Sequence, residues 1–194
     1  APQKAWQLCR ALGKGLFGKK PNQGHKVLAE LEDNNFLKGL ITQNVDNLHQ
    51  AAGSKNVLEI HGDHQHLQCL QWATVIPVEN AHYTMKDVPA CAHCRSPLKP
   101  NVVLFGEAVR SMDRIEELIV NCDLLLVIGT SAQIYPAAGL PEIVKEQGGL
   151  LYEFNQESAL SLRGYTNTKS AADFFFQGDL AATLPLFGRS VLQT

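Results

Sequence analysis

Hydrophobic residues fall in short blocks along the chain, and their spacing alternates between the periods of helices and strands. An apolar stripe at 27–31 follows Pro21, which predicts a helix that begins after this proline. Segments 39–43 and 57–60 are predicted as short buried strands. Segment 123–129 is a nearly continuous apolar run that ends in glycine, as in a central parallel strand covered on both faces.

The second half of the chain continues this alternation. We predict a strand over 101–105, a helix from about Met112, and a further helix that ends at the glycine pair 148–149. The remaining elements are strands over 150–154 and 173–176 and a final helix over 180–187. Strands that alternate with helices predict an α/β fold, a doubly wound parallel sheet.

Regular apolar periodicity is lost between Gly62 and Pro100. This stretch holds four of the seven histidines and three of the five cysteines. A segment of about 40 residues rarely buries enough apolar surface to fold alone, so we expect a metal to stabilise it. We therefore expect a large domain built from 1–60 and 101–194, and a small zinc-binding insert over 61–100.

Composition and charge narrow the function classes. The 194 residues are 45% hydrophobic and 19% charged, which is an ordinary globular balance. The formal net charge of −2 argues against direct nucleic-acid binding and against a polybasic membrane patch. No apolar run approaches the roughly 20 residues of a membrane span, and no signal peptide is evident at the start. A cytoplasmic location is the expectation.

The cysteine spacing suggests a metal site. Cys91 and Cys94 form a C-x-x-C pair, which is half of a tetrahedral zinc site. Cys69 offers a third thiolate, but Trp72 stands where a second C-x-x-C pair would place the fourth. The fourth ligand would then be a histidine, an acidic side chain or water. The alternative is that the metal has been lost and the three cysteines only pack.

Polar clusters follow three predicted strands, at 42–46, 129–131 and 155–158. Ligands of open α/β sheets bind at the carboxyl ends of the strands, so these clusters are expected to converge on one crevice. The alternative is ordinary turn chemistry. His61 follows another strand and precedes Gly62, which allows close approach by a substrate. Histidine suits general-base catalysis near neutral pH, although a structural histidine is the simpler reading of a lone one.

Four motifs occur in an order and spacing that resemble the sirtuin family. They are TQNVDNLHQAAG at 42–53, EIHG at 59–62, VVLFGE at 102–107, and GTS at 129–131 with PAA at 136–138. The resemblance extends from about Trp6 to Phe187. Sirtuins are NAD-dependent protein lysine deacylases with a Rossmann-like large domain and a small zinc-bearing insert, and the resemblance implies both for this chain.

The resemblance also implies roles for individual residues. His61 would be the general base, Gln43 would hold the ribose, and Asn44 and Asp46 would hold the nicotinamide end of NAD. The implied residues for the adenosine side are Gly129, Thr130, Ser131 and Asn155, with Asp179 and Leu180 beside the adenine. The implied contacts of the acyl-lysine are Val103 and Phe105, and the implied metal ligands are Cys69, Cys91 and Cys94.

The implied reaction removes acetyl or another neutral acyl group from protein lysine side chains. It consumes NAD as cosubstrate, releases nicotinamide and O-acyl-ADP-ribose, and takes an acyl-lysine protein or peptide as partner. Cys9 and Leu12 stand where desuccinylating members carry tyrosine and arginine, so a preference for neutral acyl groups is expected. The glycine-rich pyrophosphate loop of the family is not found before Thr42, so we expect the chain to lack it. The alternatives are a non-catalytic module that binds NAD, ADP-ribose or a partner, and a protein ADP-ribosyltransferase.

Overall fold

The chain forms two compact units in the computed structural model, which describes residues 2–16, 18–160 and 172–193. Unit 1 comprises Ala1–Lys20, Thr42–Leu48 and Glu59–Arg110, and unit 2 comprises Pro21–Ile41, His49–Leu58 and Ser111–Thr194. The large and small domain boundaries expected from the sequence remain a prediction.

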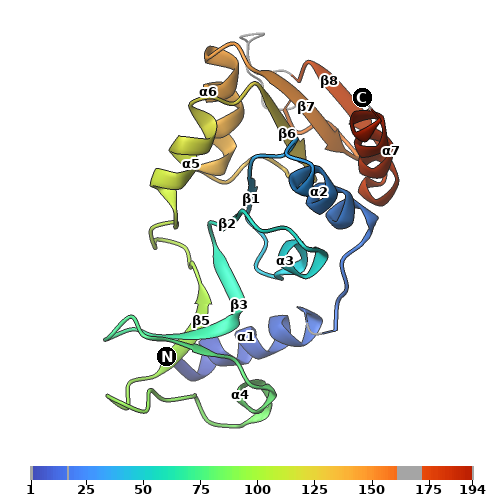
Figure 1. Cartoon of the computed structure of the whole chain (residues 1–194). Coiled ribbons are helices and arrows are strands. Elements are labelled where there is room, and N and C mark those ends of the chain that lie inside the picture. Colours follow the sequence, from blue (N-terminus) through green and yellow to red (C-terminus); the bar gives the residue numbers. More distant parts are fainter. Residues whose placement is uncertain (1, 17, 161–171, 194) are drawn as a thin grey trace. The chain divides into compact units, whose positions relative to one another are not determined.

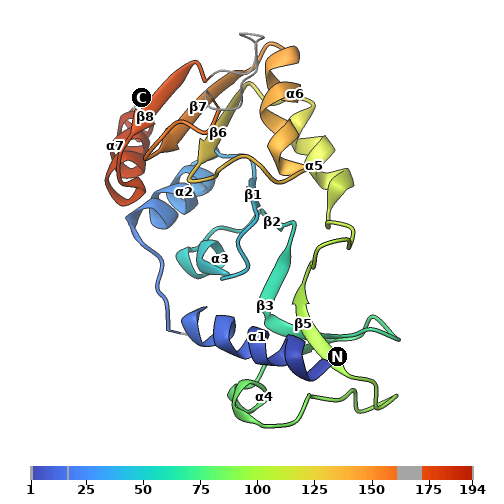
Figure 2. The ribbon, with the colours of Figure 1, turned by 180° about the vertical axis from the view of Figure 1, so that it is seen from behind.

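Unit 2 contains the parallel sheet. Its strands β6 (Leu124–Ile128), β7 (Leu150–Asn155) and β8 (Phe174–Gln177) are hydrogen-bonded in the order β6-β7-β8, and both pairs are parallel. Figures 1 and 2 show helices on both sides of this sheet, with α5 and α6 on one side and α7 and α2 on the other. Their bounds are α2 (Gln23–Asp33), α5 (Met112–Ile119), α6 (Leu140–Glu146) and α7 (Leu180–Leu192).

The core of unit 2 explains why both faces of the sheet must be apolar. Phe154 on β7 is fully buried, and its ring stacks on Phe176 of β8 with the centroids 4.4 Å apart. Val27 of α2 and Leu184 of α7 pack into the same cluster. Leu151 points to the opposite face of β7 and is also fully buried. Helices therefore cover both faces, as a doubly wound sheet requires.

The expectation that 123–129 forms a central strand is wrong for the described residues. β6 pairs only with β7 there, and β7 is the central strand of the three. Leu124 is 38% exposed. A continuous apolar run indicates that both faces of a strand are buried. It does not indicate whether the strand lies at the centre or at the edge of its sheet.

Unit 1 is built on an antiparallel sheet with strand order β4-β3-β5. Its elements are α1 (Pro2–Leu16), β3 (Gly62–Cys69), β4 (Val75–Pro77), α4 (Asn80–Thr84) and β5 (Leu98–Val102). Trp6 of α1 packs in a core with Leu67, Tyr83 and Leu98, and with two of the cysteines, Cys69 and Cys91. Helix α1 thus folds with the cysteine-bearing sheet.

Two strands of unit 1 differ from the sequence prediction. β5 begins at Leu98 and ends at Val102, whereas the prediction was 101–105. β3 is eight residues long, and its buried or half-buried residues include the polar side chains of Asp63, His64 and His66. Hydrogen bonds rather than apolar contacts hold these side chains, so hydrophobic periodicity does not reveal the strand.

Two further strands form a separate pair, β1 (Leu40–Thr42) with β2 (Val57–Glu59). The last residues of these strands, Thr42 and Glu59, belong to unit 1. The short helices α3 (Leu48–Ala52) and η1 (Ala137–Gly139) complete the described elements. Within the described ranges, no helix combines the length and the apolar character that crossing a bilayer requires.

Candidate functional site

His61 is held directly after β2, in a defined ring orientation. Its Nδ1 lies 3.1 Å from the carbonyl oxygen of Gln43. A carbonyl oxygen can only accept a hydrogen bond, so this contact requires the proton on Nδ1. In the neutral ring, Nε2 then keeps its lone pair. The side chain is half-buried, and the arrangement presents Nε2 as a proton acceptor.

The loop between β1 and α3 contains Gln43, Asn44 and Asp46. The hydroxyl of Thr42 accepts a hydrogen bond from the amide of Asn44, and Asp46 accepts one from the amide of Leu48. His64 of β3 holds the loop from the other side, because its Nδ1 lies 2.6 Å from the carbonyl oxygen of Val45. The structure therefore places all three predicted loop residues in unit 1, the unit that contains His61.

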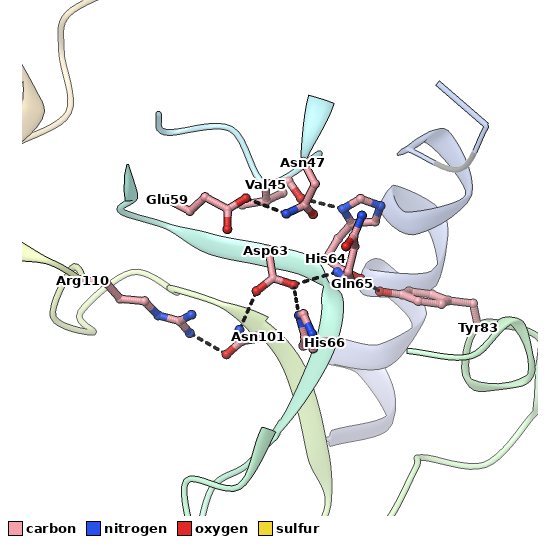
Figure 3. A network of polar contacts seen from close by, with 10 residues as sticks. All are labelled: Val45, Asn47, Glu59, Asp63, His64, Gln65, His66, Tyr83, Asn101 and Arg110. Carbon is pink, nitrogen blue, oxygen red and sulfur yellow. Dashed lines mark hydrogen bonds and ion pairs between the residues drawn. The ribbon is translucent and has the colours of Figure 1, made fainter. Parts of the chain in front are cut away.

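A buried polar network is centred on Asp63, two residues after His61 in the chain (Figure 3). Asp63 is 6% exposed and accepts hydrogen bonds from the Asn101 side chain at 2.7 Å and from the Gln65 amide at 2.9 Å. The ring Nδ1 of His66 lies 2.7 Å from the same carboxylate. Asn101 in turn accepts a hydrogen bond from Arg110. These hydrogen-bonded side chains thus connect β3, β5 and the segment after β5.

The backbone of the same region connects His61 to the predicted acyl-lysine residues. The carbonyl oxygen of His61 accepts a hydrogen bond from the amide of Val103 at 2.8 Å. Phe105 is 101% exposed, so its ring is available for contact. Glu107 accepts hydrogen bonds from the amide of Leu104 and from Lys99. The pKa of the Glu107 carboxyl is lowered, chiefly by the Lys99 hydrogen bond.

In unit 2, polar residues meet at the carboxyl ends of the parallel strands. Asn155 at the end of β7 donates a hydrogen bond to the carbonyl oxygen of Thr130, after β6. Asp179 caps α7 by accepting from the amide of Ala181. Gly129 has a φ of +57°, and a Cβ there would lie 2.7 Å from the Leu180 side chain. Two of the three predicted clusters, 129–131 and 155–158, are therefore brought together, and the third, 42–46, lies in unit 1.

Cys69, Cys91 and Cys94 form a thiol cluster in unit 1. Their sulfur atoms all lie within 4.8 Å of one another, and those of Cys69 and Cys94 are 3.5 Å apart. Tetrahedral Zn–S bonds of about 2.3 Å place two sulfurs about 3.8 Å apart, so the donor set fits zinc. Hydrogen bonds from the hydroxyl and the amide of Ser96 lower the pKa of the Cys94 thiol to about 7. These residues would hold the metal, which would connect the turn that begins at Cys69 to the turn that contains Cys91 and Cys94.

These features define a class of protein, a doubly wound α/β fold combined with a small sheet that bears a three-thiol cluster. The model of the Sir2 family matches residues 2–136, and the chain belongs to this family. The expected resemblance is confirmed, and so is the expected fold class.

The chain is also similar to individual proteins. It is 42% identical to an NAD-dependent protein deacetylase of Caldivirga maquilingensis over 80% of this chain and 62% of that protein. It is 38% identical to an NAD-dependent protein deacylase of Pyrococcus furiosus over 95% of this chain and 73% of that one. A crystal structure of a Sir2 homolog–NAD complex superposes with a TM-score of 0.89 at 36% identity, over 99% of this chain and 73% of that one. The chain thus spans roughly two thirds of the length of these curated relatives.

The sequence reasoning missed Asp63, Asn101 and Arg110. They lie far apart along the chain, and no spacing rule connects them. A weak signal was present, since Asn101 is a polar residue at the start of the apolar run 102–105. The contact between Asn101 and Asp63 could not be inferred from the sequence, because it depends on the register between β3 and β5.

Proposed function

We propose that this chain removes acetyl or other neutral acyl groups from protein lysine side chains and consumes NAD in doing so. The single observation that carries the proposal is the orientation of His61, whose Nδ1 faces a carbonyl oxygen and leaves Nε2 as the proton acceptor. A protein that only bound a nucleotide would not need such a base. Membership of a family whose similar members are named NAD-dependent deacetylases and deacylases supports the same reading.

The residues proposed to bind NAD lie near the ends of strands in both units. Gln43, Asn44 and Asp46 would bind the ribose and the nicotinamide. The residues proposed for the adenosine are Gly129, Thr130, Ser131, Asn155, Asp179 and Leu180. NAD, when bound, supplies a glycosidic bond with nicotinamide as its leaving group. His61 takes a proton from a ribose hydroxyl, and this role requires no nucleophile from the protein.

The overall reaction balances with one water. Acyl-lysine, NAD and water give lysine, nicotinamide and O-acyl-ADP-ribose. Val103 and Phe105 would contact the acyl-lysine. A substrate peptide would add as a strand along this segment, which is a common mode of peptide recognition.

The proposed acyl group is neutral. Cys9 is uncharged and half-buried, and burial raises the pKa of its thiol. The neighbouring cation is already engaged, because Arg10 donates hydrogen bonds to the carbonyl oxygens of Lys86 and Asp87. The side chain of Leu12 lies outside the described part of the structure. Comparable turnover of succinyl-lysine and acetyl-lysine peptides would contradict this preference.

We infer a cytoplasmic location and no nucleic-acid or membrane partner. The location rests on cysteine usage, since all five cysteines are free thiols and three of them form a cluster that could hold a metal ion. Such thiols persist in a reducing compartment. The inference about partners rests on the formal net charge of −2, which does not favour anionic nucleic acid or membrane surfaces.

The experiment that tests the function mixes the 194-residue chain with NAD and an acetyl-lysine peptide. Nicotinamide and deacetylated peptide are followed by mass spectrometry. We expect His61→Ala to lower turnover by roughly 10²–10⁴-fold without loss of nucleotide binding. The matched control is His82→Gln, which changes a histidine of α4 in the same unit and should leave turnover unchanged.

Three results would contradict the proposal. Turnover by the His61→Ala variant equal to that of the wild type would show that His61 is not the general base. Binding of NAD or ADP-ribose without any turnover would favour the non-catalytic module. A peptide that gains an ADP-ribosyl group instead of losing its acetyl group would favour the transferase.

A further inference from the structure

The two turns that carry the cysteines have the same backbone geometry. In the first turn, the amide of Cys69 donates a hydrogen bond of 2.8 Å to the carbonyl oxygen of Thr74. In the second, the amide of Cys91 donates one of 2.8 Å to the carbonyl oxygen of Ser96. Residues 69–74 therefore correspond in position to residues 91–96.

A second feature supports this correspondence. The fifth residue of each turn has a left-handed backbone, with φ of +52° at Ala73 and +62° at Arg95. Non-glycine residues rarely adopt this conformation, so its recurrence at the same place indicates one shared turn type. The residue before it is Trp72 in the first turn and Cys94 in the second. Trp72 therefore occupies the place of the fourth metal ligand.

The backbone around this fourth position is arranged for a thiolate site. The amides of Gln71 and Trp72 donate hydrogen bonds to the thiol of Cys69, while burial raises the pKa of that thiol. The Trp72 side chain cannot ligate a metal and is 60% exposed. An indole thus stands in the place of the fourth thiolate, on a turn with the same backbone geometry as the one that presents Cys94.

The nearest histidine in the turns is turned toward Trp72. The rings of His93 and Trp72 meet edge to face, with centroids 4.8 Å apart at an angle of 85°. In the described part of the chain, the group within 4.8 Å of the three sulfurs contains no histidine nitrogen and no carboxylate oxygen. The described residues thus provide three ligands and no fourth.

We propose that this site binds one zinc ion through three thiolates and carries an exchangeable fourth ligand from solution. Zinc in proteins is almost always four-coordinate, and sites with three protein ligands complete the set with water or another small molecule. A small thiol or imidazole would displace the water, because soft sulfur and nitrogen donors suit zinc. The site therefore differs from a closed structural zinc site in binding small ligands and in releasing its metal more readily.

The test uses the intact chain loaded with Co²⁺ in place of zinc, under argon with a phosphine reductant. The sulfur-to-cobalt charge-transfer band reports the number of thiolates, and the visible bands report the fourth ligand. We expect the wild-type bands to shift when 2-mercaptoethanol or imidazole is added. We expect Trp72→Cys to raise the charge-transfer intensity by about a third, from three thiolates to four, and to abolish the shift.

Two control variants isolate the effect. Trp72→Ala removes the indole without adding a ligand, so its bands should still shift on addition of thiol. His93→Ala should leave the wild-type cobalt spectrum unchanged. Zinc release to a chelator, followed without any enzyme assay, should be slower from Trp72→Cys than from the wild type or Trp72→Ala.

Three results would overturn the proposal. A wild-type spectrum that does not respond to added thiol or imidazole would mean that the protein closes the site. A changed spectrum in His93→Ala would identify His93 as the closing ligand. Binding of less than about half an equivalent of metal by the folded wild type would mean that the thiols only pack. The wild-type response alone decides the matter if Trp72→Cys does not fold.

Discussion

The indole Nε1 of Trp6 donates a hydrogen bond of 2.7 Å to the carbonyl oxygen of Leu98, 92 residues away in the chain. Trp6 is 2% exposed and its ring also meets Tyr83 edge to face. This contact attaches α1 to β5 and to the core that contains the cysteines. The first helix of the chain is therefore part of the framework of the proposed metal site.

Trp6→Phe and Trp6→Ala separate the two contributions of this residue. The phenylalanine variant keeps most of the apolar volume but leaves the buried Leu98 carbonyl without its partner, at a cost of about 1–3 kcal/mol in the free energy of unfolding. The alanine variant also leaves a cavity and should cost about 3–5 kcal/mol. Urea unfolding followed by circular dichroism measures the loss of stability in both variants. Equal unfolding midpoints for the wild type and Trp6→Phe would show that the hydrogen bond from Trp6 to Leu98 does not contribute to stability.

Gly62, next to His61, is predicted to tolerate no side chain. Its φ is +77°, and a Cβ there would lie 2.0 Å from the backbone oxygen of Asn101. Gly106 is the matched control, because its φ is +89° but a Cβ there would meet nothing within 4 Å. Gly106→Ala should cost only the backbone strain, roughly 1–2 kcal/mol. Gly62→Ala should cost about 1–3 kcal/mol more. Thermal unfolding of the two variants checks the difference, and similar losses would show that β3 and β5 can separate at this point.

The buried network should lose stability when its central member is removed. Asn101 is 5% exposed and joins Asp63 to Arg110. Asn101→Ala should lower the free energy of unfolding by about 1–3 kcal/mol, because it leaves a buried carboxylate oxygen without a donor. A double-mutant cycle with Arg110→Gln should show a coupling of about 0.5–3 kcal/mol. Strict additivity of the two changes would mean that the network does not act as a unit.

The ion pair between Lys145 and Asp173 predicts a pH dependence of stability in unit 2. Lys145 Nζ lies 2.8 Å from the Asp173 carboxylate, and this hydrogen bond is the main cause of the lowered pKa of Asp173. A lowered pKa in the folded state stabilises the protein above the pKa of unfolded aspartate, about 3.9. The stabilisation is lost as the pH falls through the folded pKa.

Lys145→Met should therefore lower the free energy of unfolding by about 0.5–1 kcal/mol at neutral pH. The difference from the wild type should shrink as the pH falls below about 4. Lys55→Met is the control, since the Lys55–Asp33 pair is mostly exposed and should contribute less. A pH-independent difference between Lys145→Met and the wild type would show that packing of the lysine stem, rather than the ion pair, is responsible.

The order of helices and strands could be predicted because both depend on near neighbours in the sequence. The predicted helix after Pro21 is α2, the predicted helix from about Met112 is α5, and the apolar run 150–154 lies within β7. Each pattern reflects which face of one element is buried, and spacing of two or about 3.6 residues records this directly.

Patterns of this kind failed where polar groups or irregular turns decide the structure. The run 101–105 was predicted as a strand because it is apolar. The strand instead ends at Val102, and Phe105 is fully exposed. The exposure follows from a turn that Glu107 closes, through hydrogen bonds with Leu104 that no periodicity encodes.

The sequence by itself determined the alternation of strands and helices, the family, and the candidate residues, including three cysteines and a tryptophan in the place of a fourth. The tertiary structure decided what each residue contacts: the carbonyl oxygen that orients His61, the partners of Asn101, and the backbone hydrogen bonds that give turns 69–74 and 91–96 the same geometry. The physical reason is that helix and strand patterns depend on residues a few positions apart. Hydrogen-bond partners and metal ligands depend instead on strand register and turn geometry, which bring together residues that lie far apart in the chain.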